Sequence, residues 1–276
     1  MYFEKEIITS RNNQFVKWAS ALSEKKNRKE NGYFLAEGVK LTKEALEANL
    51  PVDYLIVSES KKDAVLDAIG DFCSSEKYEK TKFLTVSEGV FEKISTEKAP
   101  QGVISVIKHL DFFRDMDIIY KEEFFLKPEE KAIFLFSLRD PSNLGAVIRS
   151  SVAFGIDHII LSADCADIYS PKTVRSAMGS IFRVKVTTVG DVKSFISAAQ
   201  HNSRRIFAAE LSDRAVSLHD INLSGNDIVM IGNEGHGIDP DVSICCDGSL
   251  YIPISKKTES LNASVAAAIF MWEQSK

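Results

Sequence analysis

Three short segments of the 276-residue chain combine residue types that could bind a ligand, and each follows an apolar stretch. The first spans residues 139–149. Asn143 stands where we expect a helix N-cap, and Gly145 lies one turn before Arg149 on the same helical face. A glycine inside a helix costs about 1 kcal/mol relative to alanine, so the pattern favours close approach of another group beside the Arg149 guanidinium. The alternative is a capped helix with an ordinary surface arginine.

The second segment, residues 231–237, holds three glycines within six positions. Gly232, Gly235 and Gly237 permit backbone conformations closed to other residues and let a ligand contact the main chain directly. Their spacing, G-x-x-G-x-G, differs from the dinucleotide fingerprint G-x-G-x-x-G, and no P-loop lysine follows. The segment therefore favours a backbone-lined ligand loop and disfavours a Rossmann-type nucleotide enzyme.

The third segment, residues 252–262, leads into the alanine-rich stretch 263–269. Ser260 and Asn262 are natural helix caps, and a helix rich in alanine lets another backbone pack closely against it. Taken alone, this segment predicts only a strand, a loop and a helix.

The elements that must position these segments alternate between strand and helix. We expect helices at residues 144–154, from Ser170-Pro171 and at 262–273, because caps, an N1 proline and helical periodicity mark them. We expect strands at 132–138, a continuous apolar run, and at 158–161, 184–189, 205–209, 228–231 and 251–254. Such alternation predicts a mostly parallel sheet with helices on both faces. Ligands bind such sheets at the carboxyl ends of the strands, where all three segments would lie.

The first hundred residues predict a smaller α/β domain. Residues 13–22 and 38–48 have helical patterns, and residues 54–58 and 102–107 are rich in β-branched and apolar residues. Residues 108–131 show no clean period. We therefore predict an α/β protein with a domain at residues 1–107, a linker at 108–131 and a larger domain at 132–276.

Charge limits the kinds of nucleic-acid binding that fit this chain. The formal net charge of −5 excludes a protein that coats nucleic acid nonspecifically. Residues 1–29 nevertheless hold seven Lys and Arg against three Glu. We predict that the densest part of this stretch, Lys25, Lys26, Arg28 and Lys29, contacts phosphates of a nucleic acid. The alternative is a solvated helix face.

Targeting and metal signals are lacking. The charged start, Met1-Tyr-Phe-Glu-Lys-Glu, has no apolar core of a signal peptide, and no stretch approaches a membrane-spanning length. The four cysteines show no C-x-x-C spacing. We therefore predict a cytoplasmic protein with reduced thiols, no metal site and no membrane partner.

In their order and spacing, the three segments resemble the motifs of the SpoU (TrmH) family of RNA 2′-O-methyltransferases in the SPOUT superfamily. The matching residues are Asp140-Pro-Ser-Asn-Leu-Gly145, Ala153-Phe-Gly155, Pro171, Val174-Arg175, Met178-Gly-Ser180, Gly232 to Gly237 and Ser260-Leu-Asn-Ala-Ser-Val-Ala266. The front half resembles the family's L30e-like substrate-binding domain in Ser10-Arg-Asn-Asn13, Phe34-Leu-Ala-Glu-Gly38 and Pro100-Gln-Gly102.

The resemblance implies an enzyme that uses S-adenosylmethionine to methylate a ribose 2′-hydroxyl in rRNA or tRNA. It implies that Gly232, Ile252 and Leu261 contact the cofactor. It places Arg149 at the catalytic position, and polar residues that shape the site at Asn143, Glu234, Ser260 and Asn262. It also implies a SPOUT-like C-terminal trefoil knot and a homodimer with its sites at the interface. Lys256 and Ser142 depart from glycines frequent in the family.

Proton removal from the 2′-hydroxyl is the step that the residues leave open. A guanidinium has a pKa above about 12 and stays charged in proteins. We therefore expect Arg149 to hold phosphate and stabilise charge developing on oxygen, with the proton taken by an unidentified group. His236 is a possible accessory or a plain loop residue. The competing function is a catalytically inactive RNA-binding protein of the same fold.

Overall fold

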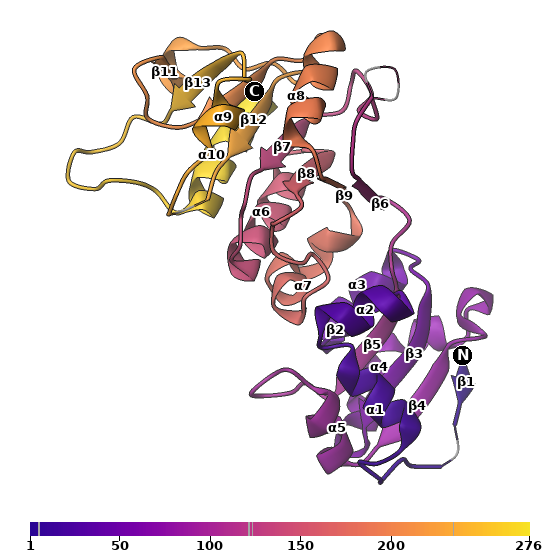
Figure 1. The fold of residues 1–276 in the computed structure, drawn as a ribbon. Coiled ribbons are helices and arrows are strands. Elements are labelled where there is room, and N and C mark those ends of the chain that lie inside the picture. The colour runs from indigo at the N-terminus through magenta and orange to yellow at the C-terminus, as the bar shows by residue number, and fades with distance from the viewer. Residues whose placement is uncertain (5, 121, 123, 234) are drawn as a thin grey trace. The chain divides into compact units, whose positions relative to one another are not determined.

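The computed structural model describes residues 1–4, 6–120, 122, 124–233 and 235–276. These residues form two compact units, each with its own β-sheet (Figure 1). The N-terminal unit comprises Met1–Leu110 together with Asp167–Arg183, and the C-terminal unit comprises Asp111–Ala166 together with Val184–Lys276. The segment Asp167–Arg183 thus packs with the front of the chain, although it lies far along the sequence.

The N-terminal unit is built on a mixed sheet of five strands, in the order β1-β4-β3-β5-β2. The strands are β1 Tyr2–Phe3, β2 Tyr33–Glu37, β3 Val52–Ser58, β4 Lys82–Val86 and β5 Val103–Lys108. Strands β1, β3 and β4 run parallel, whereas β5 runs antiparallel to both β2 and β3. The predicted strands at 54–58 and 102–107 are confirmed.

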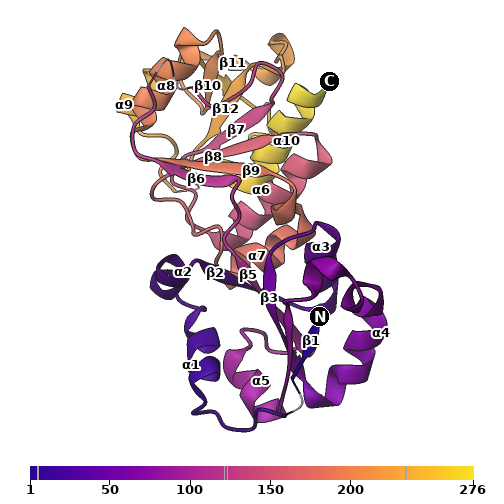
Figure 2. The same ribbon diagram turned by 90° about the vertical axis from the view of Figure 1, so that its right-hand side faces the viewer.

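Helices cover both faces of this sheet, with α1 and α5 on one side and α3 and α4 on the other (Figure 2). The helices are α1 Gln14–Ala21, α2 Lys25–Asn31, α3 Val39–Glu47, α4 Lys62–Cys73, α5 Glu88–Ile94 and α7 Pro171–Ala177, with 3-10 turns at η1 Glu59–Lys61, η2 Glu76–Tyr78 and η4 Met178–Phe182. The Asn13 side chain caps α1 by accepting from the Phe15 amide. The predicted helices at 13–22 and 38–48 are confirmed as α1 and α3.

The C-terminal unit holds an eight-stranded sheet in the order β11-β13-β10-β12-β7-β8-β9-β6, with parallel pairing throughout the described residues. Its strands are β6 Phe113–Met116, β7 Ala132–Leu135, β8 His158–Ser162, β9 Lys185–Val189, β10 Ile206–Ala209, β11 Ala215–Ser217, β12 Ile228–Ile231 and β13 Gly248–Tyr251. The prediction of a mostly parallel sheet is confirmed. Strand β6 lies within residues 108–131, the segment without a clean period.

The last predicted strand, 251–254, is wrong by three residues, because β13 ends at Tyr251. Proline has no backbone N–H and is therefore excluded from strands that need ladder hydrogen bonds. Pro253 stands in the predicted range, so residues 252–254 leave the sheet and enter the loop that follows it.

Two helices lie on each face of the C-terminal sheet: α6 packs on α10 on one face, and α8 and α9 cover the other (Figure 2). The bounds are α6 Pro141–Ala153, α8 Val192–His201, α9 Pro240–Ser243 and α10 Ala263–Ser275, with a 3-10 turn at η5 Leu218–Asp220. Phe134 and Met230 from the sheet pack with Phe195 of α8 in one buried core. Helices thus cover both faces of the central strands, whereas the edge strands β6 and β11 are partly exposed.

The cap of α6 differs from the prediction. The N-cap is Asp140, whose carboxylate accepts a 2.7 Å hydrogen bond from the Ser142 amide, and Pro141 is the first helical residue. The proline ring holds the φ angle that a helix start requires, so the helix begins earlier than expected. Asn143 therefore lies within the first turn. Gly145 is buried on α6, whereas Arg149, one turn later, is exposed.

Candidate active site

The three chemically suggestive segments meet at one edge of the C-terminal sheet. They follow β7, β12 and β13, and β10 lies between β12 and β13. Because these strands are parallel, their carboxyl ends and the loops that leave them gather at the same edge. The expected convergence of the second and third segments takes the form of a cleft at this edge.

The cleft contains about 840 Å3 of space, open to solvent on one side. Its lining residues come from β10, β12, β13, α10 and the loops between them: Ala209, Glu210, Leu211, Ile231, Gly232, Asn233, Gly237, Tyr251, Ile252, Ile254, Glu259, Ser260, Leu261, Ala263, Ala266 and Phe270. Four residues predicted for the site, Gly232, Ile252, Ser260 and Leu261, are among them.

The lining has an apolar part and an acidic part. Ile231, Ile254 and Phe270 supply apolar surface, whereas Glu210 and Glu259 supply carboxylates. A ligand that combines a flat aromatic ring with positive charge suits such a lining, because the ring face packs on apolar surface and the charge is attracted by the carboxylates. S-adenosylmethionine has an adenine ring, a sulfonium and an amino group, so the lining fits it.

Glu210 was missed by the sequence reasoning. Its carboxylate accepts hydrogen bonds from Ser243 Oγ at 2.8 Å and Ser249 Oγ at 2.6 Å, and Arg214 lies 3.7 Å away. These contacts fix the Glu210 carboxylate at the carboxyl edge of the sheet. The available signal was an acidic residue directly after the apolar run 205–209, which is the position where α/β sheets bind ligands.

The glycine loop after β12 is shaped by contacts within the chain. A Cβ on Gly232 would lie 2.5 Å from the backbone carbon of Gly237, and Gly237 itself has φ of +67°. Asn233 and Gly237 form an antiparallel bridge. Gly232 is therefore required by the backbone of the loop itself.

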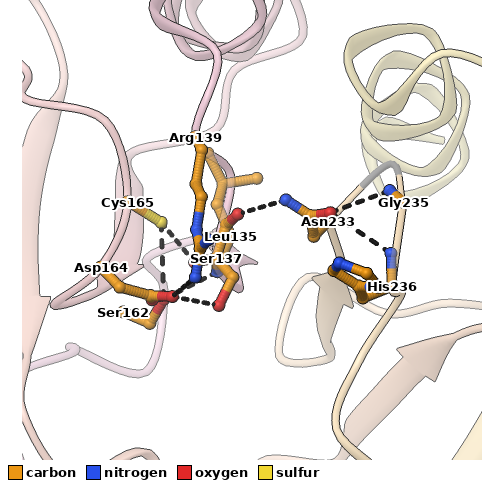
Figure 3. A network of polar contacts seen from close by, with 9 residues as sticks. All are labelled: Leu135, Ser137, Arg139, Ser162, Asp164, Cys165, Asn233, Gly235 and His236. Atoms are coloured by element: carbon orange, nitrogen blue, oxygen red, sulfur yellow. Dashed lines mark hydrogen bonds and ion pairs between the residues drawn. The ribbon is translucent and has the colours of Figure 1, made fainter.

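Asn233 ties this glycine loop to the loop after β7. Its Oδ1 accepts from the amides of Gly235 (2.8 Å) and His236 (3.3 Å), and its Nδ2 donates to the Ser137 carbonyl at 2.9 Å. One side chain thus fixes the relative position of the first two segments (Figure 3).

The loop after β7 is held in an unusual conformation by Asp164 (Figure 3). Ser137 has φ of +53°, a left-handed value uncommon outside glycine. Its hydroxyl donates to Asp164 at 2.5 Å, and Ser162 and Arg139 donate to the same carboxylate at 2.7 Å and 3.3 Å. Burial raises the pKa of Asp164, but the hydrogen bonds outweigh it and lower the pKa overall. The ionised carboxylate thereby holds the turn that leads into α6.

The first and third segments are joined directly. Asn262, the N-cap of α10, accepts from the Ser264 amide and donates through Nδ2 to Asn143 Oδ1 at 3.1 Å. Arg149 is exposed on α6 and forms no hydrogen bond or ion pair with another residue that the structure describes. Glu234, also predicted for the site, lies outside the described residues.

The basic stretch of the N-terminal unit divides into two kinds of residue. Lys25, Lys26 and Lys29 are exposed on α2. Arg28 is 3% exposed, donates to the Leu22 and Ser23 carbonyls at 2.8 Å and 2.6 Å, and pairs with Asp167. Its guanidinium is therefore engaged in packing, and we no longer include it among the residues that contact RNA.

The described residues contain neither a membrane-spanning helix nor a cluster of metal ligands. No described helix has both the length and the apolar character needed to cross a membrane. Among the same residues, no group of three or more His, Cys, Asp and Glu side chains is arranged to hold a metal ion.

The parallel sheet, the cleft at its carboxyl edge and the joined loops define a SPOUT-like α/β methyltransferase unit, here combined with a smaller mixed-sheet domain. The chain belongs to the SpoU rRNA methylase family, whose model matches residues 130–272. The model of an MRM3-like substrate binding domain matches residues 13–105.

Relatives and solved structures agree with this assignment. The chain is 29% identical over 266 residues to the 23S rRNA (guanosine(2553)-2′-O)-methyltransferase RlmP of Bacillus subtilis (strain 168), covering 96% of this chain and 97% of that one. It is 27% identical to the 23S rRNA (uridine(2479)-2′-O)-methyltransferase of Streptomyces viridochromogenes, covering 96% and 90%. An AdoMet-bound rRNA methyltransferase from Sinorhizobium meliloti matches with a TM-score of 0.79 and 27% identity, over 98% and 97% of the two chains. The predicted family, fold class, cofactor and enzyme class are confirmed.

Proposed function

We propose that this protein transfers the methyl group of S-adenosylmethionine to the 2′-hydroxyl of a nucleotide in ribosomal RNA. The observation that carries the proposal is the cleft, which the glycine loop and the α10 loop line together. The Asn262 to Asn143 hydrogen bond adds the first segment to the same edge. The choice of ribosomal RNA follows the relatives named above, which include enzymes for 23S rRNA.

The cleft residues hold the cofactor. Gly232, Ile252 and Leu261 present backbone groups for the adenosine part, with Phe270 as apolar surface behind it. Glu210 and Glu259 stabilise its positive charge. When bound, S-adenosylmethionine supplies a methyl group already activated by its sulfonium.

The chain's task is then to align and deprotonate the acceptor oxygen. Arg149 binds the RNA phosphate and stabilises negative charge on the 2′-oxygen, since a guanidinium offers a planar fork of donors and keeps its charge. The hydrogen bond between Asn143 and Asn262 fixes the N-terminal end of α6 against the N-terminal end of α10. It thereby orients α6, the helix that carries Arg149. Ser260 and Glu234 complete the predicted polar set. The general base stays unassigned.

Substrate RNA is selected by the N-terminal unit. Lys25, Lys26 and Lys29 on α2 contact phosphates, which position the RNA without reading its sequence. Discrimination against DNA requires no base contact, because the reacting 2′-hydroxyl exists only in RNA.

The active form is a homodimer. Val265 and Trp272 lie two helical turns apart on α10 and are 47% and 54% exposed. Apolar surface of this kind on a helix, with Phe154 directly after α6 packed beside Trp272 at a ring distance of 5.8 Å, suits a second copy of the same surface. The C-terminal trefoil knot, which the family resemblance implies, is part of the same proposal.

The test is methyl transfer from labelled S-adenosylmethionine to ribosomal and transfer RNA, combined with mapping of 2′-O-methylation in cells with and without this gene. We expect one ribosomal nucleotide to lose its modification. Loss confined to a transfer RNA would reject the ribosomal substrate. Cofactor binding without methylation of any stable RNA would favour the inactive RNA-binding protein.

A further inference from the structure

A staggered row of two Tyr–Lys pairs crosses the sheet of the N-terminal unit. Tyr33 on β2 pairs with Lys108 on β5, and Tyr54 on β3 pairs with Lys82 on β4. Strand β5 lies between β2 and β3, and Tyr54 pairs there with Val106, two residues before Lys108. The two Tyr–Lys pairs therefore lie on adjacent parts of the sheet, staggered by two residues along β5. These residues are far apart in the sequence, and only strand pairing brings them together.

The row lies on the face that α1 and α5 cover. Side chains two residues apart on a strand share a face, and Leu35, Ile56 and Val106 are each two residues from a member of the row. These three are buried in the core beneath α1 and α5. The row therefore lies at the end of that face, at the boundary between the buried core and solvent.

Helix α1 adds two aromatic rings to this end. The Phe15 and Trp18 ring centroids lie 4.9 Å and 5.7 Å from that of Tyr54, and Trp18 lies 5.5 Å from Tyr33 in an edge-on arrangement. All four rings are partly buried rather than fully enclosed. They form one connected aromatic surface that retains accessible area.

Polar contacts fix the rings in place. Trp18 Nε1 donates to Asn31 Oδ1 at 3.0 Å, and the Tyr33 hydroxyl donates to Asp53 at 2.6 Å. Burial and then the Asp53 hydrogen bond raise the pKa of Tyr33 to about 12, so this ring stays neutral. Lys108 Nζ lies 3.4 Å from the same Asp53 carboxylate. The rings are thus preorganised, which lowers the entropic cost of binding a partner.

Positive charge surrounds this aromatic surface. Lys82 Nζ lies 5.7 Å from the centroid of the Tyr54 ring, within cation–π range. Lys17, Lys82 and Lys108 are all exposed. Protein interfaces are poor in lysine, whereas single-stranded nucleic acid is bound by stacking rings flanked by cations. The mixture therefore fits a nucleotide better than a protein.

We propose that Phe15, Trp18, Tyr33 and Tyr54, with Lys82 and Lys108, form a platform that binds an unpaired nucleotide of the substrate RNA. The base stacks on the rings and the lysines contact its phosphates. The platform rests on the proposed function, since it takes the RNA that the C-terminal unit methylates. Asn31, the last residue of α2, contacts Trp18, so the platform continues the surface that carries Lys25, Lys26 and Lys29.

The test uses Trp18 as its own reporter. The chain has two tryptophans, so Trp272→Phe in the full-length protein, which keeps an aromatic ring at the proposed dimer surface, leaves Trp18 as the sole source of indole fluorescence. Titration with a single-stranded RNA of about ten nucleotides should quench this fluorescence, and a blunt RNA duplex should quench it far less. Unchanged Trp18 fluorescence while the same RNA binds, measured by anisotropy, would overturn the platform.

Substitutions provide the second arm. Tyr54→Leu should weaken binding of the single-stranded RNA about tenfold, since one stacked base contributes roughly that much. Tyr2→Leu, at a 57% exposed tyrosine of the same unit, should leave affinity unchanged. Equal affinity of both variants and the parent would reject the platform. If Tyr54→Leu fails to fold, which thermal unfolding detects, the Trp18 titration still decides.

The platform and the proposed function fail in different ways. Methylation of ribosomal RNA without a Trp18 response removes the platform and leaves the methyltransferase. Quenching by single-stranded RNA without methylation of any RNA retains the platform and removes the proposed reaction.

Discussion

The two units place their polar groups in different parts of a sheet. In the C-terminal unit they lie in loops at the carboxyl edge, where four neighbouring parallel strands end. In the N-terminal unit they lie on the sheet itself, in a row that crosses the strands. A parallel sheet buried on both faces can offer only its edge, whereas a mixed sheet whose covering helix is short leaves part of one face accessible.

This difference predicts different sensitivities. Binding at the carboxyl edge of the C-terminal sheet should depend on backbone conformation, because loops with close contacts and left-handed residues set the shape of that site. Binding on the face of the N-terminal sheet should depend on side chains, because the strands beneath them are rigid. Substitutions can therefore test whether each surface follows its own rule.

The largest effect is expected at the carboxyl edge. Arg149→Ala should reduce methyl transfer by about 100- to 1,000-fold, the usual loss when a preorganised donor to a developing oxyanion is removed. Stability and cofactor binding should stay close to normal, because Arg149 is exposed. Single-turnover transfer at saturating cofactor separates chemistry from binding.

Two further variants control this measurement. Arg149→Lys should restore little activity, since a point charge lacks the planar fork, and Arg114→Ala, at an exposed arginine of β6, should be neutral. Near-normal transfer by Arg149→Ala would remove the residue from the mechanism.

A buried histidine at the amino edge of the same sheet should make the stability of the protein depend on pH. His158, the first residue of β8, is 5% exposed, and burial lowers its pKa to about 4 despite the nearby Glu130 carboxylate. In the unfolded chain the histidine pKa is about 6.5. Between pH 6.5 and 4 the unfolded chain therefore binds a proton at His158 that the folded chain does not bind. Stability is therefore complete above pH 6.5 and is lost as pH falls toward 4, by about 3 kcal/mol.

Urea unfolding between these pH values measures the slope. His158→Gln should flatten it, whereas His219→Gln, at an exposed histidine, should leave it as it is. An equal slope in the parent and in His158→Gln would assign the acid sensitivity to other groups.

The glycine loop sharpens the comparison of edge with face. A Cβ at position 232 would meet Gly237 backbone at 2.5 Å, whereas a Cβ at position 235 meets only the Asn233 Oδ1 atom at 3.5 Å. Gly232→Ala should therefore distort the loop and weaken S-adenosylmethionine binding by about tenfold or more, the effect of roughly 1–3 kcal/mol of overpacking. Gly235→Ala should bind normally. Calorimetry decides, and identical affinities would remove the loop from the cofactor site.

The smallest effect is expected on the N-terminal unit. Replacing Lys25, Lys26 and Lys29 together with Ala should lower the slope of log affinity for RNA against log salt by roughly 2, the value for three phosphate contacts to single-stranded RNA. Methyl transfer at saturating RNA should be unaffected. The matched control replaces Lys61, Lys77 and Lys80, exposed lysines of the same unit. If the α2 variant and the control variant have equal salt slopes, α2 is an ordinary solvated helix without phosphate contacts.

Much of the catalytic unit could be predicted from the sequence. Apolar runs marked β7, β8 and β12, a cap marked α10, and the order of the three segments indicated the family. Two errors came from proline: Pro141 starts α6 one turn earlier than expected, and Pro253 ends β13 sooner. In both cases the missing N–H and fixed φ decided a boundary that apolar periodicity alone could not.

Long-range contacts were beyond the sequence pattern. Nothing in the order of residues places Glu210 beside the glycine loop, Asp164 beside Ser137, or Arg28 in a buried contact with Asp167. Each contact depends on the order of strands in the sheet or on the packing of a segment that is distant in the sequence.

The sequence by itself determined which segments carry chemistry, because loops that follow parallel strands hold their functional residues close together along the chain. Only the tertiary structure decided the cleft's acidic wall, the Asn143 to Asn262 hydrogen bond and the Tyr–Lys row. Local propensity acts over a few residues, whereas strand order and register join residues separated by tens of positions, and a shift of one residue would turn each side chain of the row to the opposite face.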